Sequence, residues 1–236
     1  WGGGTAPRPR TGGASGAAFD LNRIPGKVWR GRGRATGAFF PRLGDGFPAA
    51  LDARLPYDVA AARRLLAEAG YPKGFSVGLD CVNIAWRAAV CQAIAGMLAQ
   101  VDVRVAFRPS PSPQFFPKLT QATTSFFEVG WTPTPDPLPS LNALVRTFGS
   151  DGQGTFNAGR YSNPRLDALI DGMRAEPDLG RRRTMTAEAL KILHDELPLV
   201  PLYRRTLAWV MKPAIRLVQW PNDIFEIRFA EIAEKS

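Results

Sequence analysis

The sequence has 236 residues, 45% of them hydrophobic and 22% charged, with a formal net charge of +9. This is the composition of a folded protein, and the length suffices for one large domain or two small ones. Two cysteines and a single histidine, His194, are too few for a four-cysteine zinc site or a multi-histidine metal site. No apolar run reaches the roughly 18 residues that a membrane-spanning helix needs. We therefore expect no metal, no cofactor and no membrane span.

Most of the excess positive charge lies near the amino-terminal end. Residues 1–37 contain seven basic side chains and one acidic side chain, a net of +6. Residues 1–17 are rich in glycine and show no hydrophobic period, which predicts a disordered basic segment without a signal peptide. Residues 1–37 are then either a solvated terminus or an interaction module that binds anionic polymer or membrane. Because aromatic residues are sparse there, we expect no specific nucleic-acid binding.

Regular structure is expected from residue 58 onward. Asp58 is a good N-cap for a helix whose apolar residues recur at helical spacing up to Ala69, and Gly70 ends that helix. Alternating patterns then predict strands over 75–82, 103–107 and 125–131, and helices over 86–101, 111–123, 163–174 and 178–195. This alternation predicts an α/β fold with a mostly parallel sheet flanked by helices. Short strands are also expected over 197–203, 206–211, 215–220 and 225–232.

Several blocks of the sequence, in order and at compatible spacing, resemble one known family. They include YDVAAARRLLAEAGYPKGF, FFEVGWTPTPDPLPSLNAL, FNAGRYSNPRLDALIDGMRAEPD and RRRTMTAEALKILHDELPLVPLY. Over about residues 18–232, the chain is similar to the C-terminal lobe of the family 5 extracytoplasmic solute-binding proteins. These are the peptide- and nickel-type receptors of bacterial ABC importers.

The resemblance implies two α/β lobes that close on a small solute, without chemistry, and then dock on an ABC permease in the membrane. It also implies a periplasmic or extracytoplasmic location, a monomer, and a first lobe that is missing from this sequence. We therefore expect an inter-lobe connection over 18–57 and a periplasmic-binding-protein-like solute-binding lobe over 58–203. The strands expected within 204–236 would belong to the absent first lobe.

A candidate solute site follows the strand predicted at 125–131. Trp131 closes that strand, and a stiff, proline-rich loop with Thr132, Thr134 and Asp136 comes next. In α/β sheets, ligands sit beyond the carboxyl ends of the strands. An indole there gives a flat apolar wall, while hydroxyls and a carboxylate orient a ligand. In the alternative interpretation, Trp131 packs on the turn and Asp136 caps the following helix.

The charged anchors of the peptide-binding relatives are absent or displaced. In those relatives, an aspartate three residues after the tryptophan pairs with the peptide amino group, and Thr134 occupies this position here. Dipeptide binders also hold the carboxylate with an arginine near the strand-to-helix turn, and none precedes Arg87 here. The solute is therefore either peptide-like or an uncharged or differently charged small organic molecule.

Two further pairs of residues have two interpretations each. The loop after the candidate site places Asn157 and Tyr161 either toward the cleft or in structural roles, closing a turn and packing under the loop. Cys81 lies near a strand end and Cys91 in the next helix, so they form either a disulfide in an oxidising compartment or two separate buried thiols.

No arrangement of residues indicates catalysis. The sequence contains no G-x-S-x-G nucleophile motif to accompany His194, and no phosphate-binding glycine loop opens a helix. Asp195 and Glu196 are expected to be solvated acids, and Arg181, Arg182 and Arg183 a solvated helix face. The protein is therefore not expected to be an enzyme.

Overall fold

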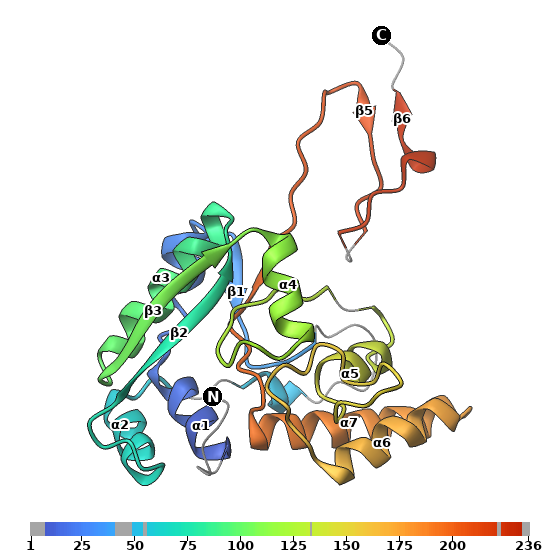
Figure 1. Ribbon diagram of the computed structural model, residues 1–236. Helices are drawn as coiled ribbons and strands as arrows, with labels where there is room; N and C mark the ends of the chain where they lie inside the picture. Colours follow the sequence, from blue (N-terminus) through green and yellow to red (C-terminus); the bar gives the residue numbers. More distant parts are fainter. Residues whose placement is uncertain (1–7, 41–48, 54–55, 133, 221–222, 233–236) are drawn as a thin grey trace.

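The computed structural model describes residues 8–40, 49–53, 56–132, 134–220 and 223–232. They form a body, residues 8–205, from which an arm, residues 206–232, projects at the top of Figure 1. The elements follow in the order α1 (Arg8–Ala18), η1 (Ile24–Val28), β1 (Gly33–Ala35), η2 (Ala49–Asp52), α2 (Val59–Glu68), β2 (Phe75–Val82), α3 (Ala85–Ala99), β3 (Val103–Ser110), α4 (Ser112–Thr120), α5 (Leu138–Leu144), α6 (Pro164–Ala175), α7 (Leu179–Glu196), β4 (Tyr203–Arg205), β5 (Ile215–Arg216), η3 (Ile227–Phe229) and β6 (Glu231–Ile232).

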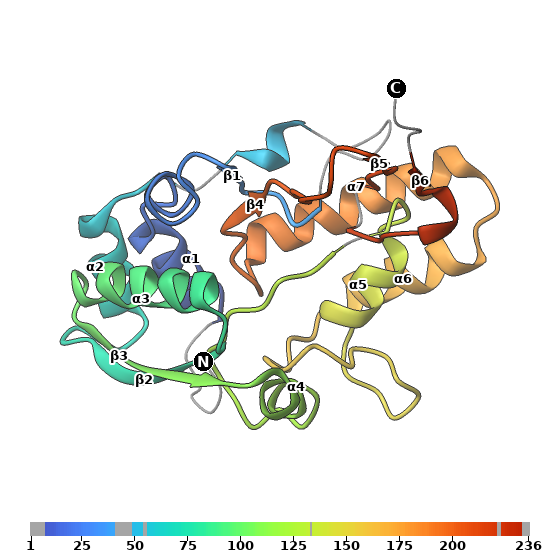
Figure 2. The ribbon, with the colours of Figure 1, turned by 90° about the horizontal axis from the view of Figure 1, so that it is seen from above.

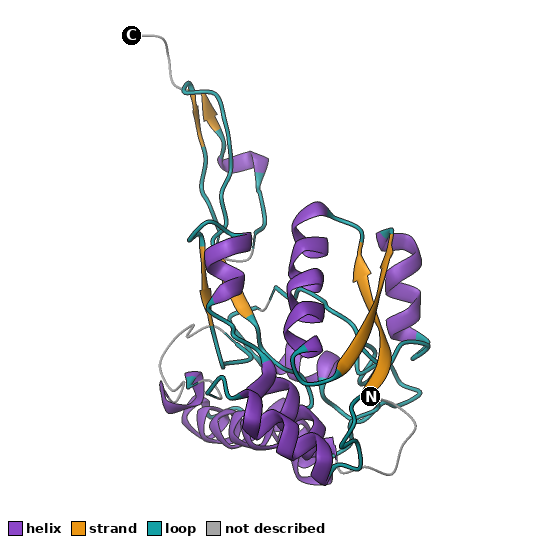
Figure 3. Cartoon of the chain, turned by 90° about the vertical axis from the view of Figure 1, so that its left-hand side faces the viewer, coloured by secondary structure: helices purple, strands orange, loops and turns teal. Residues whose placement is uncertain are grey.

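The predicted α/β architecture is confirmed. Strands β2 and β3 pair in parallel from Phe75↔Val103 to Val82↔Ser110, and α3 connects them. Figure 3 shows this strand pair with helices on both sides. Because the strands are parallel, their carboxyl ends meet at one edge of the sheet, which is where α3 begins and where β3 leads into α4.

The local start and stop signals are where the sequence places them. The Asp58 carboxylate accepts a hydrogen bond from the Ala61 amide at 2.9 Å, and Gly70 follows α2 with a φ of 92°. The Asn163 side-chain oxygen accepts from the Arg165 and Leu166 amides at the start of α6. These caps explain why α2 and α6 begin where the sequence predicted.

The predicted strand over 125–131 is wrong as a regular strand. Only Asp80↔Phe127 forms a parallel bridge, closed by hydrogen bonds from the Asp80 amide to the Phe126 carbonyl at 3.0 Å and from the Glu128 amide to the Asp80 carbonyl at 3.1 Å. β2 pairs with β3 along its whole length on its other edge, and within the described chain no residue after Glu128 in this segment pairs with β2. The segment after Glu128 therefore leaves the sheet.

The prediction that residues 1–17 are disordered is wrong over residues 8–17, which belong to α1; residues 1–7 lie outside the described residues. Ala14, Ala17 and Ala18 are buried, and α1 packs on α2. Small side chains let the two helices approach closely, and this tertiary burial compensates for a weak helical pattern.

Two large apolar cores, and a smaller third one around Phe115 of α4, hold the body together. The first core joins α1, α2 and α3 to β2 and β3, and the second joins α5, α6 and α7. Figure 2 shows the two groups of elements on opposite sides of the body, with the chain after α4 crossing from the first to the second. Among the described residues, no helix is long and apolar enough to span a membrane.

The strands predicted near the carboxyl end are mostly absent. Over 197–203 only Tyr203 is in a strand, β4, because Pro198 and Pro201 lack the amide hydrogen that a ladder needs. In the arm, the segment over 206–211 forms no strand, and β5 and β6 pair over two residues each. Nothing else in the described chain pairs with them, so the ladder does not extend.

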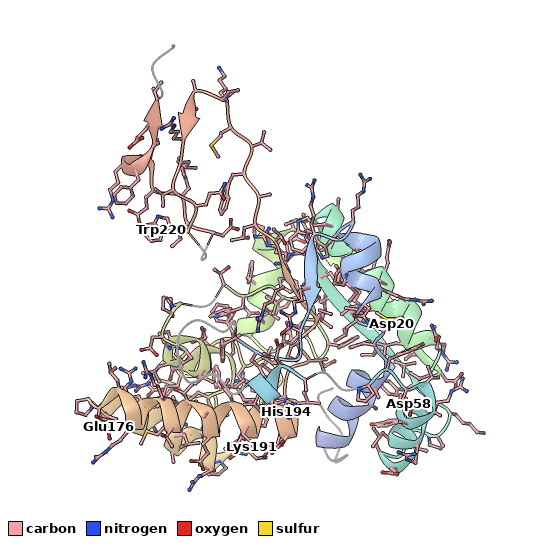
Figure 4. All side chains as sticks on the ribbon, turned by 180° about the vertical axis from the view of Figure 1, so that it is seen from behind. Asp20, Asp58, Glu176, Lys191, His194 and Trp220 are labelled. Carbon is pink, nitrogen blue, oxygen red and sulfur yellow. A yellow bond between two sulfur atoms is a disulfide. The ribbon has the colours of Figure 1, made fainter. Side chains whose placement is uncertain are left out.

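The arm exposes its apolar side chains. Nine of the 15 exposed large hydrophobic residues of the described chain belong to it, and the last buried apolar residue, Leu193, lies in α7. Figure 4 shows Trp220 on the arm, far from His194 and Lys191 on α7.

Candidate functional site

Trp131 lies in the turn that follows the Asp80↔Phe127 bridge. Its indole nitrogen donates a hydrogen bond to the Ser140 hydroxyl at 3.0 Å, and its ring meets that of Phe156 edge to face at 5.5 Å. The side chain is still 39% exposed. The indole is therefore held in one orientation with part of its surface open to a partner, as a binding wall requires.

The polar residues of the same turn mainly bind one another. The Thr134 hydroxyl donates to the Asp136 carbonyl at 2.7 Å, while Thr132 is exposed. The Asp136 carboxylate accepts from the Leu138 amide at 2.9 Å and from the Arg182 guanidinium at 2.6 Å. This matches the capping interpretation of Asp136, because both carboxylate oxygens have partners within the chain.

A charged pair that the sequence analysis did not select lies beside the turn. Arg87, in the first turn of α3, donates to the Glu128 carboxylate at 2.8 Å, and both side chains are largely buried. Burial raises the pKa of Glu128, and the neighbouring Arg87 guanidinium opposes that rise. A Cβ at Gly130 would collide with the Arg87 guanidinium, so this position suits glycine. The one sequence feature that pointed to this buried pair is the glutamate, Glu128, within the apolar run FFEVGW.

Aromatic rings surround the exposed side of that pair. The Arg87 guanidinium lies over the Trp86 ring at 4.6 Å, and Arg205 of β4 lies over the same ring at 5.7 Å. Trp29 packs against Trp86 at 4.9 Å and against Tyr203 at 5.6 Å. Four segments that are distant in sequence thus meet at the carboxyl end of the sheet.

Asn157 and Tyr161 have the structural roles of the second interpretation. The Asn157 amide group donates to the carbonyls of Arg146, at 3.0 Å, and Tyr161, at 2.7 Å, and its oxygen accepts from the Tyr161 amide at 3.0 Å. The Tyr161 hydroxyl donates to the Glu196 carboxylate at 2.7 Å. Burial, followed by this carboxylate, raises the pKa of Tyr161.

Asn157 and Tyr161 also line a cavity of about 440 Å³ between the two cores. Trp131, Thr132, Thr134 and Asp136 do not line it. Phe156 does, and it also contacts Trp131, so one aromatic ring separates the turn from the cavity. The predicted site residues therefore fall into two neighbouring places rather than one.

The remaining candidates are accounted for individually. Cys81 and Cys91 are joined in a disulfide with their Cα atoms 6.8 Å apart, and both are fully buried. His194 lies on α7 beside Asp195, whose pKa is lowered chiefly by the hydrogen bond from Lys191. In the part of the chain that the structure describes, no group of three or more histidine, cysteine, aspartate or glutamate residues is arranged to hold a metal ion.

Comparison with known proteins gives consistent matches. Residues 14–152 match the model of the bacterial extracellular solute-binding proteins, family 5 middle region. The glutathione-binding protein GsiB of Pectobacterium atrosepticum is 27% identical over 187 residues, which cover 76% of this chain and 36% of that protein. The heme-binding protein A of Haemophilus influenzae is 27% identical over 161 residues, covering 62% and 27% respectively.

Solved structures show the same fold. The periplasmic binding protein DppA of Helicobacter pylori, in complex with the peptide STSA, superimposes with a TM-score of 0.82 at 19% identity, over 96% of this chain and 44% of that chain. The murein tripeptide binding protein MppA of Escherichia coli gives 0.79 at 21% identity, over 96% and 45%. The chain thus spans less than half the length of the proteins that it matches.

Proposed function

The chain belongs to the bacterial extracellular solute-binding proteins of family 5, and we propose that it is the second lobe of a receptor that delivers a small solute to an ABC importer. The lobe binds the solute and performs no chemistry on it. In the complete receptor, the solute lies between this lobe and a first lobe, and closure of the two lobes traps it. The closed receptor then docks on the permease.

The partly exposed indole of Trp131 is the observation that carries this proposal. It stands at the carboxyl end of the sheet, where α/β folds bind their ligands, and Ser140 and Phe156 fix its orientation. A ring that is held in place but left 39% exposed loses little conformational freedom when a solute packs on it.

The arm supports the existence of a first lobe. Its exposed apolar residues, which include Trp220 and Phe225, form a surface that isolated soluble domains rarely leave uncovered. We propose that the first lobe covers them, consistent with the greater length of the relatives. The buried Cys81–Cys91 disulfide is consistent with an extracytoplasmic, oxidising compartment.

The solute is proposed to be peptide-like or another small organic molecule. Relatives include glutathione-binding and heme-binding proteins, so the family match leaves the solute class broad. The Asp136 carboxylate already binds the Arg182 guanidinium and the Leu138 amide. It therefore does not replace the aspartate that peptide-binding relatives have at the position of Thr134. This favours a solute whose recognition does not depend on a free amino group at this turn.

The test is a calorimetric titration of the purified chain with glutathione, tripeptides and their amino-acetylated forms. Because one lobe supplies half of the contacts, we expect a dissociation constant of about 1 mM, equivalent to about −4 kcal/mol. The response should disappear in W131A and persist in the matched variant W220A. A response that survives W131A, or no response to any solute at about 10 mM, would refute the proposal.

A further inference from the structure

The cavity between the two cores has the size and lining of a small-molecule site. Its volume of about 440 Å³ lies within the range of ligand pockets in proteins. Its walls come from both cores, with Phe19 and Leu79 on one side and Leu144 and Leu199 on the other. A ligand in this cavity therefore contacts both halves of the body.

The charges that line the cavity are all negative. Glu128 and Glu196 contribute carboxylates, and none of the described lining residues is a lysine, arginine or histidine. Six aromatic rings share the lining: Phe19, Tyr71, Phe126, Phe127, Phe156 and Tyr161. Carboxylates together with aromatic faces favour a cation, and they disfavour an anion.

The two carboxylates are not equivalent. Glu128 is neutralised by Arg87 at 2.8 Å. Glu196 instead accepts hydrogen bonds from two neutral donors, the Tyr161 hydroxyl and the Asn163 amide, each at 2.7 Å, and forms no ion pair with a described residue. Its negative charge therefore remains uncompensated beside the cavity.

The position of Glu196 in its helix adds to this imbalance. Glu196 is the last residue of α7, where the helix dipole presents its negative end. A carboxylate at this end is disfavoured by the unsatisfied carbonyl groups, whereas a cation would be stabilised by both. A carboxylate without an ion-pair partner among the described residues thus lines an open volume together with aromatic rings.

From this geometry we propose that the cavity binds a small organic cation, an ammonium group on an aromatic or apolar body. The ammonium lies against the Glu196 carboxylate, and the apolar body lies among the phenylalanine rings. This site is separate from the solute face at Trp131, because the 131–136 turn does not line the cavity. Its occupant would stabilise the packing of the two cores on each other.

The proposal is tested by calorimetric titration of the chain with phenethylammonium and with its neutral counterpart 2-phenylethanol. We expect saturable binding of both, with the cation bound about tenfold more tightly, as one charge-assisted contact predicts. E196Q should remove this preference while keeping an acceptor for Tyr161. The matched variant E188Q alters a carboxylate of α7 that pairs with Arg165 outside the cavity, and should leave the preference intact.

A second variant blocks the cavity without removing a charge. Gly159 lines the cavity and is exposed, its φ is not positive, and a Cβ there meets no atom within 4 Å, so the backbone accepts a side chain at this position. G159L should weaken binding of both probes, because it adds an apolar side chain at the wall of the cavity. Equal affinity for the two probes, a preference that persists in E196Q, binding that G159L does not weaken, or no saturable binding would each overturn the proposal.

Discussion

The body and the arm contain similar apolar residues in opposite environments. In the body, Phe115, Leu141 and Leu193 are fully buried in the cores. In the arm, Phe225 and Ile227 are more than half exposed, and no described arm residue is buried. The arm therefore gains little of the burial free energy that stabilises the body, which is about 25 cal/mol for each Å² of apolar surface removed from water.

This difference shows where each region's stability comes from. The body buries its apolar side chains within the chain, and its helices are capped locally, as at Asp58 and Asn163. The arm has short antiparallel pairing between β5 and β6 and one described ion pair to the body, Arg205–Asp223. Few interactions within the described chain hold the arm, so substitutions in the two regions should have different consequences.

The largest contrast is expected between two phenylalanines. F115A removes a fully buried ring from α4 and should lower the free energy of unfolding by about 3–5 kcal/mol. F225A removes a ring that is 51% exposed on the arm and should change it by less than about 0.5 kcal/mol. Urea denaturation followed by circular dichroism measures both. Equal destabilisation by the two variants would mean that the arm packs into the body's cooperative unit.

The disulfide is expected to give the next largest effect. Replacing both Cys81 and Cys91 with alanine removes a link between β2 and α3 and should destabilise the body by about 2–4 kcal/mol. The arm contains no cysteine, so its protease sensitivity in the native state should not change. The measurements are thermal unfolding and limited proteolysis. Titration of two free thiols in the denatured, unreduced protein would contradict the disulfide itself.

The same contrast explains which elements could be predicted from sequence. Helices α2 and α6 are specified locally, because Asp58, Gly70 and Asn163 satisfy or end the backbone within a few residues. A strand, in contrast, needs hydrogen bonds to a second strand, and the local sequence does not identify that second strand. The segment over 125–131 therefore reduces to one bridge, and the arm pairs over two residues where longer strands were predicted.

The site divides in the same way. Trp131 is 39% exposed, as local order suggested, but the predicted strand before it reduces to one bridge. The partners of Asn157 and Tyr161 were not predictable, because the Arg146 carbonyl and the Glu196 carboxylate lie 11 and 35 residues away. The disordered basic segment was misassigned over residues 8–17 because the burial of α1 depends on α2.

Two aspartates extend the comparison to smaller effects. D58A removes the N-cap of α2 in the body and should cost about 1 kcal/mol of stability. D223N removes the charge that pairs with Arg205 in a solvent-exposed pair between arm and body, and asparagine tolerates the φ of 62° at this position; it should cost about 0–1 kcal/mol, less at high salt. Urea titrations in low and high salt measure both variants. A salt-independent cost in D223N larger than that of D58A would show that the arm is anchored more firmly than its exposure indicates.

The smallest effect is expected in the pH dependence of stability. Burial raises the pKa of Glu128 above its ordinary value of 4.5, so the folded state favours the protonated form. Its contribution to stability is therefore complete below pH 4.5 and is lost as the pH rises through the folded-state pKa. E128Q should flatten this fall in the free energy of unfolding between pH 4 and the neutral range. The slope is the measured quantity, because E128Q also leaves Arg87 without its acidic partner and lowers stability at every pH.

E226Q, on the arm, is the matched control and should leave the slope unchanged. If the unfolding free energy of the unmodified chain rises with pH across this window while E128Q flattens it, the Arg87 contribution outweighs burial, and the environment of Glu128 is more polar than its position in the body indicates.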